Sequence, residues 1–173
     1  MRKRKNFGNK RKNKQVKALS NQVLPTKGLI DSCSFNFFFL TEDSGVDEST
    51  IAHWEKEGLF SKHLTKLQSY SKRSLKGMLS DSGMRGMLKC LRDKSAQPSN
   101  ARLHMPKEVP SCAEWYEFHL GGKQRVIGFV MPGELHGERF PDVESEFTIS
   151  KNTFYVVFFD GGHDFWPSKL KHT

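Results

Sequence analysis

Residues 154–167, with the sequence FYVVFFDGGHDFWP, constrain the fold more than any other part of the chain. Six apolar residues in a row, flanked by turn-forming residues, predict a strand that is buried on both faces. The two glycines that follow Asp160 end this strand sharply. We therefore expect His163 just beyond the end of the central strand of a sheet, where a rigid scaffold holds a partly exposed polar side chain.

The length and composition limit the classes of protein to which the chain can belong. A chain of 173 residues is expected to form one domain with a flexible extension. No apolar stretch approaches the roughly 20 residues that a membrane span needs, and no apolar segment follows the basic start as in a secretory signal. Cys33, Cys90 and Cys112 form no CxxC pair, which favours a reducing, cytoplasmic location and ordinary thiols.

The excess positive charge is confined to the start of the chain. Residues 1–17 hold nine of the 28 Lys and Arg residues and no acidic residue, which leaves 19 charges of each sign in residues 18–173. Such a run is typical of segments that bind phosphates, although a solubilising tail has the same composition. We interpret residues 1–28 as a basic flexible arm and 29–173 as the folded domain. The RNA-binding candidates in the arm are Arg2, Lys3, Arg4, Lys5, Lys10, Arg11 and Lys12.

The first part of the domain predicts a strand and then helices. Residues 29–40 include SFNFFFL, which predicts a strand whose phenylalanines pack in the core, with base stacking as the alternative. A helix is expected to be capped by Asp47 or Ser49, to run through Trp54 and to break at Gly58. Further helical segments are expected around residues 60–67, 75–79 and 84–91.

A β-hairpin is predicted by the alternating sequence of residues 113–120 and the return through 124–131, joined by two glycines. The alternation predicts two faces, one with Tyr116, Phe118 and Leu120 and the other with Trp115, Glu117 and His119. Whatever the detailed register, His119 and Arg125 are expected close together at the hairpin end.

The remaining connections complete an α+β domain, with an N-terminal strand and helices packed on a mainly antiparallel, twisted sheet. Residues 93–111 form a linker-like loop that carries Arg102 and His104. Residues 132–146 form a long acidic connection. Residues 147–149 are expected to form a short strand that pairs with the C-terminal strand through a turn at 150–152.

The order of strand, helices and three-stranded antiparallel meander resembles the RelE/ParE superfamily of bacterial toxins, in particular the RelE- and YoeB-like ribosome-dependent mRNA endonucleases. The resemblance rests on an arginine on one late strand and a histidine–aromatic pair after the last strand. It is carried by the segments SFNFFFL, LTKLQSYSKRSLKGML, EWYEFHLGGKQRVIGFV and FYVVFFDGGHDFWP. It implies a RelE/ParE-like fold and a toxin of a toxin–antitoxin system, neutralised by a protein antitoxin, that cleaves mRNA at the ribosome and inhibits translation.

The implied chemistry is RNA cleavage without a metal or cofactor, in which the 2′-hydroxyl attacks the adjacent phosphate. This reaction needs a proton acceptor, a cation beside the phosphate and a proton donor for the leaving oxygen. The resemblance assigns His163 as acid or base and Arg125 as phosphate clamp. The further catalytic candidates are Glu117 and His119. The further RNA-binding candidates are Lys123, Arg102, His104, Phe165 and Trp166.

Each assignment has a structural alternative. His163 is equally consistent with a turn residue, Arg125 with a solvated edge charge, and the pair Phe165 and Trp166 with closure of the core. A zinc site of His104, Cys112 and His119 is not expected, because no closely spaced ligand pair anchors it. Two other functions remain open. One is a non-catalytic inhibitor of a partner such as DNA gyrase, as in the ParE branch, and the other is an RNA-binding accessory protein that acts through its basic arm.

Overall fold

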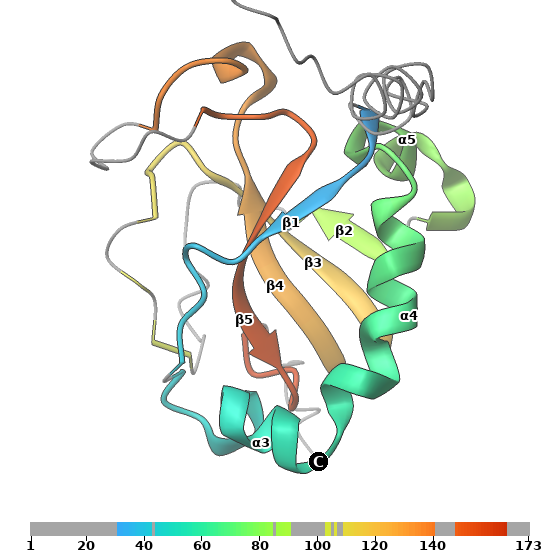
Figure 1. Cartoon of the computed structure of the whole chain (residues 1–173), viewed down its shortest axis with the longest axis vertical. Coiled ribbons are helices and arrows are strands. Elements are labelled where there is room, and N and C mark those ends of the chain that lie inside the picture. The colour runs from blue at the N-terminus through green and yellow to red at the C-terminus, as the bar shows by residue number, and fades with distance from the viewer. Residues whose placement is uncertain are drawn as a thin grey trace, which may run out of the picture. The chain divides into compact units, whose positions relative to one another are not determined.

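The computed structural model describes residues 31–42, 44–84, 86–90, 103–104, 106, 109–140 and 148–165, and the description below concerns these residues. They form an α+β unit in which three α-helices accompany a five-stranded sheet (Figure 1). The strands are β1 (Ser34–Asn36), β2 (Leu88–Cys90), β3 (Glu114–Gly121), β4 (Gln124–Val130) and β5 (Thr153–Asp160). The helices are α3 (Ile51–Lys56), α4 (Leu59–Ser71) and α5 (Leu75–Ser80), with short 3-10 turns η1 (Asp47–Ser49), η2 (Ser82–Met84) and η3 (Gly133–Leu135).

The sheet is mixed, with the strand order β1-β5-β4-β3-β2. The predicted antiparallel meander is confirmed, because β3 pairs with β4 and β4 pairs with β5 in antiparallel register. The edge strand β2 is antiparallel to β3, whereas β1 is parallel to β5 at the other edge. The chain therefore leaves one edge of the sheet, forms the helices and re-enters at the opposite edge.

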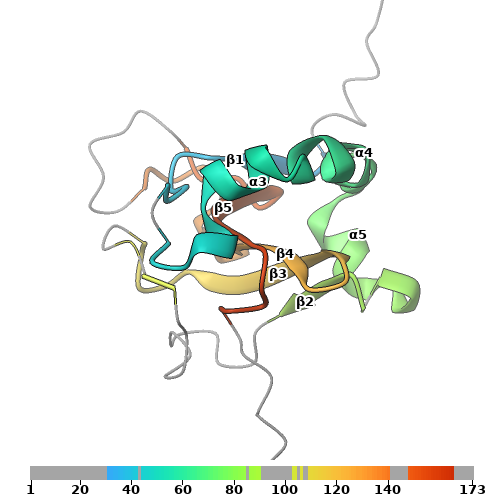
Figure 2. The same ribbon diagram turned by 90° about the horizontal axis from the view of Figure 1, so that it is seen from below.

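Strand β5 is buried along its whole length, as its apolar sequence predicts. It lies between β1 and β4, so β4 and not β5 occupies the middle of the sheet. A strand buried on both faces needs a layer on each side. The helices supply one layer: in Figure 2, α3 and α4 lie together on the same side of the strands.

Two core clusters cover the two faces. The helix-side cluster contains Trp54 of α3, Tyr70 of α4 and Met78 of α5, which agrees with helices on one face. The strands contribute to this side Tyr116, Phe118, Leu120, Val126, Val130, Phe154, Val156 and Phe159. The opposite face is covered by connecting segments, and its cluster includes Phe39, Leu103, Trp115, Ile127, Phe129, Phe140, Ile149, Tyr155, Val157, Phe158 and Phe165. The predicted alternation of β3 is confirmed by this division.

A β-bulge interrupts the alternation of β5. Ile127 pairs with Phe158 and the next residue of β4 pairs with Val156, so Val157 has no partner on β4. Val157 and Phe158 consequently both belong to the cluster opposite the helices. The carbonyl of Val157 accepts a hydrogen bond from the backbone N–H of Thr41 at 3.0 Å. The bulge therefore determines which face each later residue of β5 occupies.

Helix α3 (Ile51–Lys56) begins slightly later than the sequence suggests. Thr50, and neither Asp47 nor Ser49, caps α3 by accepting a hydrogen bond from the backbone N–H of His53 at 3.1 Å. Gly58 separates α3 from α4 as predicted, with a φ of 64° that suits glycine. The helix expected around residues 75–79 is confirmed as α5.

Two predicted elements of the first half differ in the structure. The strand expected within residues 29–40 has only three residues, because the Asn36 side chain accepts a bond from the Phe38 N–H and turns the chain. Phe37 and Phe38 are consequently about half exposed, at 50% and 54%. The helix expected around 84–91 is wrong, because β2 forms there and Leu88 pairs with Phe118.

Residues 137–139 pair with residues 148–149. Thr148 forms an isolated bridge with Arg139, so the predicted pairing of this segment with the C-terminal strand is wrong. The backbone N–H of Ile149 donates to the carbonyl of Glu138 at 2.8 Å. Within the described ranges, no helix has both the length and the apolar character to cross a membrane.

Gly128 of β4 lies where β5 leaves no room for a side chain. A Cβ there would overlap the carbonyl oxygen of Tyr155 and would lie 2.7 Å from the Phe154 ring. We expect Gly128→Ala to lower the free energy of unfolding by about 3 kcal/mol, since the interior would be overpacked. Urea denaturation measures this change. Gly133→Ala is the matched control, because nothing lies within 4 Å of its Cβ position, and a comparable loss there would contradict the explanation.

His63 makes the stability of α4 dependent on pH. Its side chain is 4% exposed and lies 5.9 Å from Trp54, and its Nε2 has no hydrogen-bond partner. Burial, followed by the charges of Lys62 and Lys66, lowers the His63 pKa below its usual 6.5. The unfolded chain therefore takes up this proton first, and stability should fall as the pH drops below about 6.5.

Urea unfolding of wild-type and His63→Phe proteins between pH 5 and 8 measures this effect. The variant should lose part of the pH dependence, because it has no imidazole to protonate on unfolding. His53→Gln on the preceding helix is the control and should keep the wild-type slope. Equal slopes for all three proteins would show that His63 is not responsible.

Candidate active site at the hairpin end of the sheet

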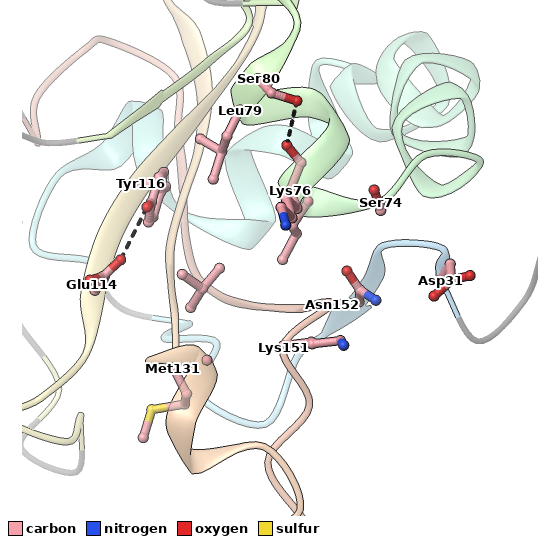
Figure 3. A pocket seen from close by; sticks show the side chains of 13 residues that line it. Asp31, Ser74, Lys76, Leu79, Ser80, Glu114, Tyr116, Met131, Lys151 and Asn152 are labelled. Atoms are coloured by element: carbon pink, nitrogen blue, oxygen red, sulfur yellow. Dashed lines mark hydrogen bonds between the residues drawn. The ribbon is translucent and has the colours of Figure 1, made fainter.

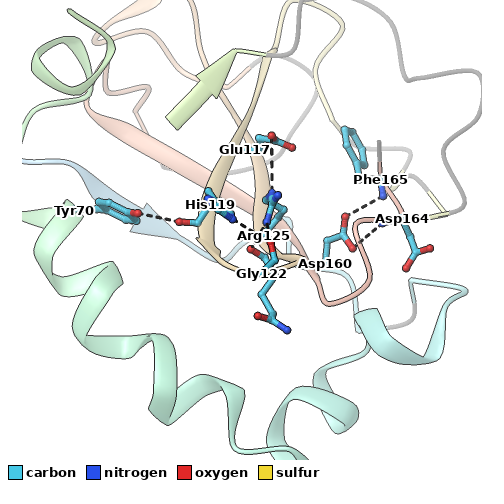
Figure 4. Close-up of polar contacts among 9 residues, drawn as sticks. Tyr70, Glu117, His119, Gly122, Arg125, Asp160, Asp164 and Phe165 are labelled. Carbon is cyan, nitrogen blue, oxygen red and sulfur yellow. Dashed lines mark hydrogen bonds and ion pairs between the residues drawn. The ribbon is translucent and has the colours of Figure 1, made fainter. Parts of the chain in front are cut away.

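Three neighbouring strands carry a polar row at one end of the sheet. His119 on β3 is the register partner of Arg125 on β4, and Arg125 is the partner of Asp160 on β5. Glu117 lies two residues before His119 and so shares its face (Figure 4). The row lies on the face opposite the helices. The predicted proximity of His119 and Arg125 is confirmed by this register.

Arg125 is held against its own hairpin. Its Nη1 donates hydrogen bonds of 2.9 Å to the carbonyl oxygens of Gly122 and Gln124. Its Nε is buried without a hydrogen bond and lies 4.0 Å from Oε1 of Glu117. Only 14% of the Arg125 side chain and 8% of the Glu117 side chain are exposed. The alternative of a solvated edge charge is therefore wrong, and a cation with a nearby carboxylate is held at low exposure.

His119 shares a carbonyl with Arg125. Its Nε2 lies 3.1 Å from the carbonyl oxygen of Gly122. A carbonyl can only accept, so this contact requires the proton on Nε2 and leaves the lone pair of Nδ1 available in the neutral ring. Lys123, at the tip of the same turn, is exposed. The hairpin end thus presents an imidazole, a guanidinium and an ammonium group within a few residues.

Helix α4 fixes the hairpin end from the other face. Lys66 donates from Nζ to the carbonyl of Leu120 at 2.8 Å, and the Tyr70 hydroxyl donates to the carbonyl of His119 at 3.0 Å. The Tyr70 ring also stacks on Phe118 with 4.8 Å between the ring centroids. Burial raises the pKa of Tyr70 to about 12, so its hydroxyl remains a hydrogen-bond donor at neutral pH. These anchors could not be predicted from local sequence patterns, because they join residues about 50 positions apart.

The turn after β5 folds back onto the same face as the polar row. The Phe165 ring stacks on Trp115 of β3, with centroids 5.4 Å apart, and lies 6.0 Å from Phe158. Trp115 is two residues before Glu117 on that strand. His163 lies within this turn, is half-buried and has a φ of 68°. Among the described residues, no hydrogen bond or ion pair engages its ring.

Phe165 belongs to the core and not to an open binding surface. It is 0% exposed, with its ring packed between Trp115 and Phe158. The prediction that it stacks on a base does not agree with this burial, whereas the alternative of core closure does. Trp166 lies outside the described residues.

The other predicted binding residues fall in different places. His104 is exposed, its backbone N–H donates to the carbonyl of Ser44 at 2.9 Å, and its ring lies against Gly45. Arg102 and the arm at 1–28 lie outside the described residues. Cys112 is an exposed free thiol. In the part of the chain that the structure describes, no three His, Cys, Asp or Glu residues are grouped to hold a metal ion.

A groove of about 820 Å³ lies at the opposite end of the sheet, on the helix side (Figure 3). It is bordered by α5, by the start of β3 and by the segment before β5. Lys76, Lys151 and Glu114 lie along it, and the Tyr116 hydroxyl donates to Glu114 at 3.1 Å. The sequence did not predict this groove, and none of the catalytic candidates lines it. The polar row is therefore a candidate site because of its chemistry and not because of a cavity.

Comparison of the chain with protein-family models, with curated proteins and with solved structures finds no match.

The pairing of Glu117 with Arg125 can be measured with a double-mutant cycle. Alanine substitutions of each and of both should give a coupling energy of about 1–2 kcal/mol in urea unfolding, because both side chains are largely shielded from water. The exposed pair Arg73–Asp81, 2.9 Å apart with side chains 53% and 43% exposed, is the control and should give less than about 0.5 kcal/mol. Equal coupling in the two pairs would show that burial does not strengthen the first.

Proposed function

We propose that the protein is an endoribonuclease that cleaves mRNA by attack of the 2′-hydroxyl, and that it acts as a RelE-like toxin at the ribosome. The observation that carries this proposal is the placement of His119 and Arg125 on one sheet face, with the His163 turn folded onto that face through Phe165. The element order of strand, helices and three-stranded meander supports it further. A protein antitoxin is the partner that this proposal implies.

Arg125 suits the role of phosphate clamp in part. Its Nη1 is already bonded to backbone carbonyls, while its Nη2 has no bond to any described residue. The two Nη2 N–H groups can therefore donate to a phosphate oxygen that approaches the hairpin end. Low exposure strengthens this interaction, because water screens the charge less. Glu117 is buried beside the guanidinium and is better placed to balance its charge than to contact substrate.

Two histidines can divide the proton transfers. In neutral His119 the hydrogen bond from Nε2 leaves Nδ1 unprotonated, so this atom can accept the proton of the attacking 2′-hydroxyl. His163, in its protonated form, can donate to the leaving 5′ oxygen. The first step forms the bond from O2′ to phosphorus and breaks the bond from phosphorus to O5′. The products are a 2′,3′-cyclic phosphate and a 5′-hydroxyl end.

The basic arm would supply the affinity that the rest of the chain lacks. Residues 18–173 have no net charge, whereas the nine cations of residues 1–17 can bind ribosomal RNA through its phosphates. The salt dependence of RNA binding should therefore reside mainly in the arm. This division of labour also keeps open an RNA-binding accessory function that depends on the arm alone.

The test is RNA cleavage in a translation extract by wild-type, His163→Ala and Arg125→Met proteins, with mapping of RNA 5′ ends. Each substitution should lower the cleavage rate by about 100-fold or more, because a proton donor or the phosphate charge is lost. In the bell-shaped pH profile of wild type, His163→Ala should remove the limb that falls at high pH. His53→Ala, on α3, is the matched control and should cleave normally.

Other outcomes would assign the protein differently. Growth arrest that persists in both substituted proteins but is lost on deletion of residues 1–17 would contradict catalysis and favour an RNA-binding function. Arrest with intact mRNA and gyrase-trapped, linearised DNA would favour the ParE-like alternative.

A further inference from the structure

We propose that Asp160 is a positioning residue that holds His163 beside the polar row. The catalytic consequence rests on the proposed function, whereas the positioning itself can be measured without activity. Asp160 ends β5 directly opposite Arg125, and its carboxylate organises the turn that contains His163 (Figure 4).

The carboxylate of Asp160 closes the turn around His163. Oδ1 accepts a 2.9 Å hydrogen bond from the backbone N–H of Asp164, and Oδ2 accepts one of 2.9 Å from Phe165. Asp160 is 0% exposed, so each of these contacts is shielded from water. A carboxylate suits this place because the turn presents two backbone N–H donors, and both carboxylate oxygens can accept a hydrogen bond. Since backbone groups occupy both oxygens, Asp160 is suited to positioning and not to proton transfer.

Ser49 attaches the same turn to η1. Its hydroxyl donates to Oδ1 of Asp160 at 3.4 Å and accepts from the backbone N–H of Gly161 at 3.2 Å. Gly161 lies so close to the carbonyl oxygen of Glu48 that a Cβ at this position would overlap it. The turn is therefore fixed on both sides of His163, by Ser49 and Gly161 before it and by the bonds to Asp160 after it.

His163 adopts a backbone conformation that its side chain disfavours. It is the only non-glycine residue with a positive φ in the part of the chain that the structure describes. A left-handed conformation at such a residue is maintained only where its surroundings enforce it. Glycine would meet the backbone requirement with less strain. The chain thus carries a histidine at a position where the backbone conformation alone favours glycine.

The bulge at Val157 puts Asp160 on the correct face. Phe159 packs on the helix side, so Asp160 lies on the opposite face with Arg125. If the residues of β5 alternated strictly from Val156 onward with no bulge, Asp160 would face the helices. The bulge, the carboxylate and the strained turn therefore act together to bring His163 to the face that carries His119 and Arg125.

The experiment compares wild-type and Asp160→Asn full-length protein by RNA cleavage and by NMR of the His163 ring and backbone. An amide has a single acceptor oxygen, so one of the two turn bonds is lost. We expect kcat to fall by about ten- to a hundred-fold with KM nearly unchanged, because binding remains while the proton donor is displaced. The His163 resonances and its φ-dependent coupling should change as well.

Asp81→Asn is the matched control. Oδ1 of Asp81 accepts a 2.9 Å bond from the backbone N–H of Gly83 in an exposed turn near α5. The same chemical change there should leave kcat and the His163 resonances unaltered. Ser49→Ala is a milder second variant, in which the carboxylate and its two turn bonds remain, and it should give a smaller loss of kcat. It keeps the test decisive if Asp160→Asn fails to fold.

The outcomes separate this inference from the proposed function. If wild type does not cleave RNA, the proposed function is wrong, and the NMR comparison still decides whether Asp160 positions His163. If the folded Asp160→Asn and Ser49→Ala proteins keep the wild-type His163 resonances, the positioning role is overturned. A fall in thermal stability with unchanged kcat and unchanged resonances would likewise assign Asp160 a structural role only.

Discussion

The antiparallel pairing of β4 with β5 is the interaction on which the rest of the structure depends. Because β5 is buried on both faces, the chain must provide a helical layer on one side and a layer of connecting segments on the other. The bulge at Val157 then decides how the end of β5 is oriented. This break in the alternation places both Val157 and Phe158 in the second core cluster, and it leaves Asp160 on that same face.

The contacts that hold the hairpin end and the side chains of the polar row lie on opposite faces of the sheet. On the helix side, α4 holds the hairpin through backbone carbonyls, by way of Lys66 and Tyr70, and so leaves the side chains of the hairpin end available. The opposite face carries His119 and Arg125. Lys66 and Tyr70 therefore fix the position of the polar row without belonging to it.

Local sequence patterns were enough to predict the hairpin strands. The elements that depend on contacts between distant residues could not be predicted in the same way. The alternation of β3, its hairpin with β4 and the proximity of His119 to Arg125 follow from sequence because a hairpin is a local structure. The segment that forms β2 has a helical composition and becomes a strand only through pairing with β3. The burial of Phe165 depends on Trp115, some 50 residues earlier, and the role of Asp160 depends on a bulge that no residue pattern announced.

Unsatisfied buried polar groups and strained backbone conformations indicate a functional site only where several of them lie close together. Arg125 has a buried Nε without a hydrogen bond, and His163 has a strained backbone, and both features occur at the same end of one sheet face. His63 also has a buried nitrogen without a hydrogen bond, but it packs beside Trp54 on the helix side of the sheet. A single buried nitrogen without a hydrogen bond, such as that of His63, lowers the stability locally and does not by itself indicate a site. A charged group, an imidazole and an enforced turn on one face form an arrangement that stability alone does not require, since apolar residues could close the same sheet end at lower cost.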